Sequence, residues 1–286
     1  MGRAWGSAAD GATHASGTLR RMSAPRIHVA APLRSGLELV LPTNAARHVQ
    51  VLRLQPGAAL TLFDGQGGEW TAAVLQMGRR EVTATVLQAR PRDCELRCAV
   101  TLALGMPANE RMDTLIEKAT ELGAAAIQPL VCERSVLRIA GERAERKAAH
   151  WQAIAVAACE QSGRNRLPEI AAARPLSDWL TSLPRAADQS VHDPAASLAS
   201  RPLHDTPVRL LLSLDPAAPA LLSLLQPMRP SQVTLLSGPE GGLSADEQRS
   251  AVQHGFIPVS LGPRVLRAET APLAALACIA ALEGLL

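Results

Sequence analysis

The sequence contains no tyrosine and only two phenylalanines among its 286 residues. Aromatic side chains provide the stacking platforms on which many proteins hold single-stranded nucleic acid, so stacking is excluded as the main means of recognition. The five cysteines are scattered and odd in number, with no CxxC pair and no nearby paired histidines. This spacing argues against a disulfide framework and a structural zinc site, so we expect no metal and a reducing, cytoplasmic setting.

Long apolar runs are also missing. No stretch approaches the roughly eighteen uninterrupted apolar residues that predict a transmembrane helix, so we expect no membrane span. The first residues are rich in glycine, alanine and serine and lack the apolar centre of a signal peptide. We interpret residues 1–24 as a disordered extension and note Met22 as a candidate start of the native chain.

Charge is unevenly placed along the chain. Residues 1–98 contain twelve arginines, no lysine and seven acidic residues, a net of +5, whereas residues 99–286 carry a net of −2. A basic N-terminal part beside a near-neutral C-terminal part suggests that the first part meets a polyanion. A basic face that is simply solvated explains the same numbers on charge alone.

Residues 25–95 show mostly short strand patterns, at 37–41, 59–63, 70–74 and 81–86, interrupted by one short helix. This pattern predicts a small β-barrel. Arg47 and Arg53 lie on or just after the helix, and Arg79 and Arg80 lie on a predicted hairpin tip. Arginine is well suited to phosphate contacts, so these four are candidate RNA-binding residues, although exposed arginines are common on any surface.

Residues 98–286 read differently. An almost continuous apolar run at 98–104, a helix with an apolar stripe and a second strand at 125–131 form a βαβ unit. This predicts an α/β domain with a mostly parallel sheet and helices on its faces. Later strand patterns at 208–214, 233–236 and 257–261 extend the same sheet.

Two glycine-containing turns follow the last two of these strands. Residues 233–236 lead into Ser-Gly-Pro-Glu-Gly-Gly at 237–242, and residues 257–261 lead into Leu-Gly-Pro-Arg at 261–264. Both turns would bring bare backbone to the edge of the sheet where ligands of open α/β proteins bind. A GxGxxG fingerprint is missing, which disfavours a dehydrogenase or a Rossmann-type methyltransferase.

Taken together, several motifs resemble the RsmE-type family of 16S ribosomal RNA uridine-N3-methyltransferases, of the SPOUT class. They are EKATELG at 117–123, ERS at 133–135, EQSGRNRLPEI at 160–170, GPEGG at 238–242 and LGPRVLRAET at 261–270. The resemblance covers the chain from Pro25 to the C-terminus. It implies that the first domain is a PUA-like barrel and that the second is a SPOUT methyltransferase domain with a deep trefoil knot.

The resemblance also implies S-adenosyl-L-methionine as cofactor. The residues assigned to contact it are Leu214, Gly238, Gly241, Leu261, Gly262 and Leu266. We expect the catalytic group to comprise Arg264, Arg267 and Arg134 as stabilising or phosphate-anchoring side chains and Glu269 as a tentative base or an arginine partner. Three further residues, Arg164, Asn165 and Arg166, follow a long helix and are candidate RNA contacts. The simpler structural interpretation is that the arginines only complement the dipole at the C-terminal end of this helix.

For function, the resemblance implies methylation of a decoding-centre uridine in 16S rRNA of the assembled small subunit by a homodimer. Departures from the family pattern are Ala108 and Asn109, where relatives often have a basic residue, and Ala271, in place of a frequent second threonine. Two alternatives remain open: a SPOUT methyltransferase acting on transfer RNA, and a non-catalytic RNA-binding assembly factor.

Overall fold

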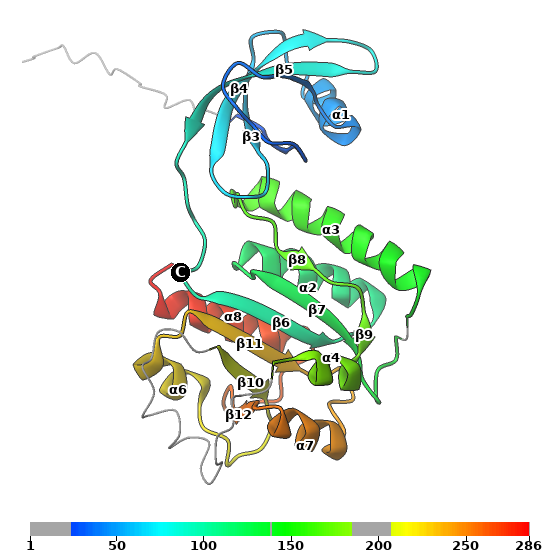
Figure 1. Cartoon of the computed structure of the whole chain (residues 1–286), viewed down its shortest axis with the longest axis vertical. Coiled ribbons are helices and arrows are strands. Elements are labelled where there is room, and N and C mark those ends of the chain that lie inside the picture. The colour runs from blue at the N-terminus through cyan, green and yellow to red at the C-terminus, as the bar shows by residue number, and fades with distance from the viewer. Residues whose placement is uncertain (1–23, 138, 185–206, 286) are drawn as a thin grey trace, which may run out of the picture.

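Two sheets, each with its own hydrophobic core, organise the chain (Figure 1). The computed structural model describes residues 24–137, 139–184 and 207–285. The predicted disordered extension, residues 1–24, lies outside the described residues except for Ala24. We refer to the parts built on the first and second sheets as the N-terminal and C-terminal domains.

The N-terminal domain is a curled five-stranded sheet in the order β1-β3-β4-β5-β2. All its pairings are antiparallel except that of β1 with β3. Helix α1 packs its buried Ala45, Ala46 and Val49 against this sheet, which completes the core. The elements are β1 (Arg26–His28), β2 (Glu38–Val40), α1 (Thr43–Val51), β3 (Ala59–Phe63), β4 (Glu69–Met77) and β5 (Val82–Arg90).

The C-terminal domain is an α/β structure whose strands pair only in parallel, in the order β12-β10-β11-β6-β7-β8, with β9 also beside β7. Its strands are β6 (Ala99–Gly105), β7 (Ala126–Val131), β8 (Glu169–Ile170), β9 (Arg174–Pro175), β10 (Val208–Leu212), β11 (Gln232–Ser237) and β12 (Ile257–Val259). Its helices are α2 (Asn109–Glu121), α3 (Glu142–Ser162), α4 (Leu176–Ser182), α6 (Leu221–Met228), α7 (Ala245–Gln253) and α8 (Thr270–Leu282).

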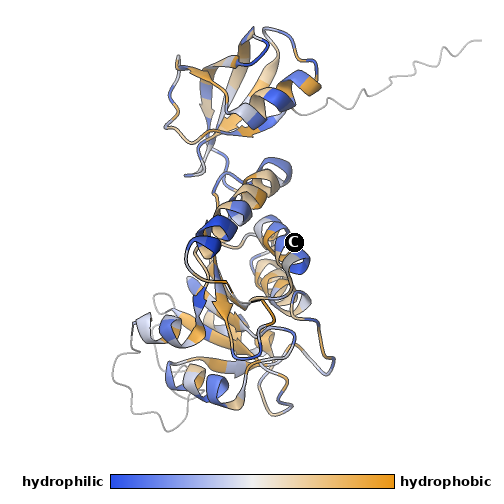
Figure 2. Cartoon of the chain, turned by 90° about the vertical axis from the view of Figure 1, so that its right-hand side faces the viewer, coloured by the Kyte–Doolittle hydropathy of each residue, from blue (hydrophilic) through white to orange (hydrophobic). Residues whose placement is uncertain are grey.

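Helices cover both faces of this sheet because its strands are apolar on both sides. On β11, Val233 and Leu235 point into the core shared with α2, α3, α6 and α8, whereas Leu236 points into the core with α4 and α7. This alternation follows from the two-residue period of a strand. Figure 2 shows the result, with hydrophobic colour gathered on the strands and hydrophilic residues on outer helix surfaces.

The topology brings the loops that follow β6, β10, β11 and β12 to one edge of the sheet, because these four strands are parallel neighbours. The mostly parallel α/β domain and the preceding curled sheet confirm the predicted fold class. The trefoil knot that the resemblance implies is not tested by the strand order and stays a prediction. Among the described residues, no helix has the length and apolar character that crossing a bilayer requires.

Candidate functional site

A cavity of about 820 Å³ opens at the edge of the sheet where β10, β11 and β12 end. Its wall is formed by the loops after these strands, together with Arg111 of α2 and Arg134 of the loop after β7. The volume falls in the range of roughly 300–1,000 Å³ that is typical of small-molecule sites. The geometry therefore places one ligand-sized space at the edge that the order of strands and turns predicts.

All six residues predicted to contact a cofactor line this cavity: Leu214, Gly238, Gly241, Leu261, Gly262 and Leu266. Two apolar side chains on its wall are unusually exposed, with Leu214 at 72% and Val265 at 78%. Exposed apolar groups grouped beside a cavity are typical of surfaces that a ligand covers. The wall can therefore receive an apolar or aromatic ring.

The glycines of the two turns keep the backbone close to the cavity. Gly262 has φ +104°, a conformation that residues with a side chain rarely adopt, and a Cβ built there would meet nothing within 4 Å. A Cβ at Gly238 would lie 2.8 Å from the Leu243 nitrogen, so this turn is too tight for a side chain. Both turns thus expose backbone N–H and C=O groups to a ligand, as glycine permits.

Gly105, the last residue of β6, was not singled out from the sequence. A Cβ at this position would lie 2.5 Å from both Cδ and N of Pro239, in the first turn. Only glycine at the end of β6 lets the turn after β11 pack so closely. The signal available in the sequence was a glycine directly after an apolar strand, which alone is common.

The predicted catalytic arginines meet at the cavity, whereas the predicted carboxylate does not. Arg134, Arg264 and Arg267 are exposed and line the wall. Glu269 is not among the lining residues; its Oε1 atom lies 3.9 Å from Nε of Arg111. The Oε2 atom of Glu269 is buried without a hydrogen-bond partner among the described residues.

Arg111 is a residue of the site that sequence reasoning missed. Its side chain lines the cavity and donates to Oε1 of Glu240 at 3.3 Å. Its Nε atom also lies 3.9 Å from Oε1 of Glu269. The backbone N–H of Ala108 donates to the same Glu240 oxygen at 3.0 Å, which ties the start of α2 to the first turn. Because this hydrogen bond uses only the backbone of residue 108, the alanine found here in place of a basic residue does not remove it. The sequence offered no sign that these carboxylates, distant along the chain, meet Arg111.

The ERS motif supports the same wall from behind. The Arg134 guanidinium donates to the Gly241 carbonyl at 3.1 Å, so this arginine holds the first turn while it borders the cavity. Ser135 is buried, and its hydroxyl accepts from the Cys132 N–H at 3.0 Å. Burial raises the pKa of the Cys132 thiol to about 12, so this cysteine stays protonated and does not act as a nucleophile at neutral pH.

The RNA contacts predicted for Arg164 and Asn165 are wrong. Their exposed fractions are 4% and 2%, and their polar atoms are used inside the protein. Arg164 donates to the carbonyls of Thr120 and Ala124 at 2.8 and 3.0 Å and forms an ion pair with Glu95. The physical reason is that the segment after α3 lies between the two domains rather than on the surface.

The other predicted RNA-binding residues, Arg47, Arg53, Arg79, Arg80 and Arg166, are all exposed. Their role in RNA binding stays a prediction. Arg79 and Arg80 follow β4 at the hairpin tip, and Gln50 of α1 donates to the carbonyls of Gly78 and Arg79 at 2.9 and 3.3 Å. This contact holds the hairpin against the helix that carries Arg47.

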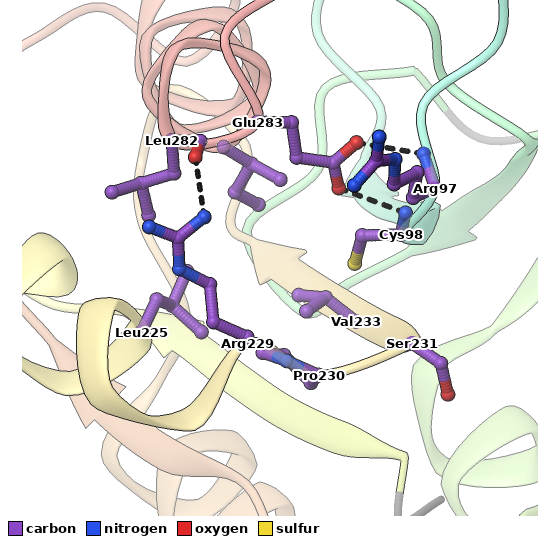
Figure 3. Close-up of a pocket in the computed structure, with 10 residues that line it drawn as sticks. Arg97, Cys98, Leu225, Arg229, Pro230, Ser231, Val233, Leu282 and Glu283 are labelled. Atoms are coloured by element: carbon purple, nitrogen blue, oxygen red, sulfur yellow. Dashed lines mark hydrogen bonds between the residues drawn. The ribbon is translucent and has the colours of Figure 1, made fainter. Parts of the chain in front are cut away.

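A second cavity, of about 470 Å³, lies at the opposite edge of the sheet, where β6 and β11 begin (Figure 3). Its charged groups close the end of α8: the Glu283 carboxylate accepts from the N–H groups of Arg97 and Cys98 at 2.6 and 2.8 Å. Arg229 donates to the Leu282 carbonyl at 2.7 Å. These bonds give the Glu283 carboxylate and the Arg229 guanidinium structural roles, and none of the predicted site residues lines this cavity. The first cavity is therefore the candidate site.

Comparison with known proteins identifies the family. A profile described as an RNA methyltransferase domain matches residues 94–280, and one described as an RNA methyltransferase PUA domain matches residues 41–87. A Synechocystis protein named ribosomal RNA small subunit methyltransferase E is 37% identical over 246 residues, which cover 85% of this chain and 73% of that protein. This chain belongs to the ribosomal RNA small subunit methyltransferase E family.

Other members agree along most of their length. The methyltransferase E of Mycobacterium bovis is 33% identical over 234 residues, which cover 82% of each protein. A crystal structure of the methyltransferase E of Neisseria gonorrhoeae, bound to S-adenosyl methionine, superposes with a TM-score of 0.77 at 33% identity. The match covers 91% of this chain and 98% of that one. Both domains of the chain are therefore shared with methyltransferase E.

Proposed function

We propose that this chain transfers a methyl group from S-adenosyl-L-methionine to N3 of a decoding-centre uridine in 16S rRNA of the assembled small ribosomal subunit. One observation carries the proposal. The two glycine turns that carry the family resemblance enclose a cavity with four arginines on its wall, the three predicted ones and Arg111. The chain belongs to a family in which a member is described as bound to S-adenosyl methionine.

The cavity suits this cofactor on its own residues. Exposed Leu214 and Val265 provide apolar surface for a flat ring, and the turns around Gly238 and Gly262 provide backbone groups for polar contacts. When bound, S-adenosylmethionine supplies an electrophilic methyl carbon attached to a sulfonium. The tasks left to the protein are to align the acceptor with this carbon and to stabilise the charge that develops.

The arginines match the electrostatic task. Uridine N3 carries a proton, and as this proton passes to water in the open cavity, negative charge spreads over the base oxygens beside N3. Arginine remains protonated and donates hydrogen bonds in a fixed plane, so Arg134, Arg264 and Arg267 stabilise this charge or hold an adjacent phosphate. Glu269 contacts Arg111 and does not line the cavity, so its role in this proposal is to orient Arg111.

The N-terminal domain supplies the RNA contacts in this proposal. Arg47, Arg53, Arg79 and Arg80 are exposed on it, and arginine contacts to phosphate position a protein on RNA without reading its sequence. Arg166 adds a further exposed cation beside the boundary between the domains. A cytoplasmic location follows from a ribosomal substrate. The resemblance further supports a homodimer, which light scattering coupled to size-exclusion chromatography tests.

The deciding experiment uses isotopically labelled S-adenosylmethionine. The chain is incubated with small subunits that lack the modification, with naked 16S rRNA and with transfer RNA, and digested nucleosides are identified by mass spectrometry. We expect labelled 3-methyluridine from the subunits alone. Label in transfer RNA or in another nucleoside would overturn the substrate, and no label in any sample would favour the non-catalytic assembly factor.

A further inference from the structure

The segment after α3, residues 163–167, joins the two domains through its backbone. The N–H of Gly67, between β3 and β4, donates to the Asn165 carbonyl at 3.1 Å. The N–H of Leu167 donates to the Gly65 carbonyl at 3.1 Å. We call residues 163–167 the seam. In Figure 1 it lies where the end of α3 meets the N-terminal domain.

Buried polar side chains add to the seam. Asn165, 2% exposed, accepts through Oδ1 from the Arg26 guanidinium of β1 and donates through Nδ2 to the Arg92 carbonyl at 3.1 Å. Arg26 also donates to the Arg164 carbonyl at 3.1 Å and forms an ion pair with Glu69. One buried amide therefore contacts both the N-terminal domain and the stretch between β5 and β6.

The other side of the seam is fixed to the C-terminal domain. Arg164 binds the carbonyls of Thr120 and Ala124 at the end of α2 and pairs with Glu95. All three guanidinium nitrogens of Arg164 donate to partners, which is the condition under which buried polar networks rigidify a structure. On the other side of the seam, Nε of Arg26 is buried without a hydrogen-bond partner among the described residues. The seam is thus anchored on both sides.

Close packing leaves little room for the domains to shift. A Cβ at Gly65 would lie 3.0 Å from Leu167, and a Cβ at Gly67 would lie 3.0 Å from the Arg166 guanidinium carbon. In addition, the His28 N–H of β1 donates to Oε1 of Glu160 in α3 at 3.0 Å. The stretch between β5 and β6 alone would leave the orientation of the domains free, so these contacts set it.

We propose that Asn165 and Arg26 are positioning residues that hold the basic surface of the N-terminal domain at one orientation relative to the cavity. The inference rests on the proposed function. The hairpin with Arg79 and Arg80 lies at the end of the molecule away from the C-terminal domain, so a small rotation at the seam moves it far (Figures 1 and 2). An RNA that contacts both places binds best when their geometry is set in advance.

The test compares Asn165→Ala with Gly65→Ala, which disturb the same boundary from opposite domains. The matched control is Gln161→Ala, which truncates an exposed amide close to the seam. We expect the KM for small subunits to rise about tenfold in both seam variants, the effect of losing roughly 1.4 kcal/mol. The kcat value and the Kd for S-adenosylmethionine should change less than about twofold, because the cavity is not touched. Gln161→Ala should match the wild type.

Hydrogen–deuterium exchange measures directly how well the backbone amides of the seam are protected. The amides of His28, Gly67 and Leu167 should exchange faster in both seam variants, while those of β6 and β11 keep their protection. A higher KM without faster exchange would mean that Asn165 acts on RNA directly, which overturns the inference. Faster exchange with an unchanged KM, or an equal loss of cofactor affinity, overturns it as well. A wild-type chain that methylates no subunits refutes the proposed function, whereas exchange still reports on the seam.

Discussion

Replacing Gly105, which does not itself line the cavity, by alanine should weaken cofactor binding. The added methyl carbon would lie 2.5 Å from Cδ and N of Pro239 and 2.9 Å from the Gly238 carbonyl carbon. Non-bonded carbon atoms are most stable about 3.5–4.0 Å apart, so β6 or the turn must move by roughly 1 Å. Because backbone atoms of Gly238 and Pro239 line the cavity, this movement distorts the site itself.

Overpacking of this kind costs about 1–3 kcal/mol. If the whole cost falls on the bound state, the Kd for S-adenosylmethionine rises between about fivefold and about 150-fold. Isothermal titration calorimetry measures this change. The control is Gly36→Ala in the N-terminal domain, where φ is +77° and a Cβ would meet nothing within 4 Å. It should lower the melting temperature and leave the Kd unchanged.

An unchanged Kd in Gly105→Ala would refute the reasoning, because it would show that the first turn can move without affecting the ligand. A Kd that rises in both variants by the same factor would also refute it, since only Gly105 lies near the cavity.

Three further changes test other parts of the proposal. Arg111→Ala should lower kcat about a hundredfold with little change in cofactor Kd, because a cation on the cavity wall is lost. Unchanged single-turnover rates would exclude a role of Arg111 in stabilising the transition state. The double variant Arg79→Ala/Arg80→Ala should bind the small ribosomal subunit more weakly and reduce the slope of log affinity against log salt concentration by roughly 1.5. A slope equal to that of the wild type would show that neither arginine contacts RNA phosphate. Burial raises the pKa of Glu160, so its contribution to stability is present below its unfolded pKa and is lost as pH rises through the raised folded value. Glu160→Gln, which can still accept from the His28 N–H, should therefore gain melting temperature relative to the wild type as pH rises through that window, and a constant difference would contradict the burial effect.

The parallel character of the sheet and the edge at which the cavity lies could be predicted from the sequence, whereas the spatial order of the strands comes from the structure. Apolar runs such as those that became β6 and β11 are long enough and continuous enough to require helices on both faces of a sheet. Parallel neighbours end at the same edge, so the turns at Gly238 and Gly262 had to meet there. The six residues that the resemblance assigns to the cofactor line one cavity, and their contact with a cofactor stays a prediction.

Partners distant along the chain could not be predicted. Arg164 and the exposed Arg166 belong to the same short motif, yet one is buried against Glu95 and the other faces solvent. Local composition is the same for both, because an arginine in a short polar stretch can satisfy its donors with water, with phosphate or with protein carbonyls. Only the packing of this segment against the end of α2 and against the stretch between β5 and β6 decides which of these applies to Arg164.

The sequence by itself therefore determined the two kinds of sheet, the edge where the glycine turns meet and the residues of those turns. The tertiary structure alone decided that Glu269 and Glu240 converge on Arg111, that Gly105 makes room for Pro239, and that Asn165 lies between the domains. The physical reason is that these two groups of features depend on interactions over different distances along the chain. Backbone propensity and strand direction act over a few residues, whereas burial and ion pairing depend on which distant surfaces the folded chain brings together.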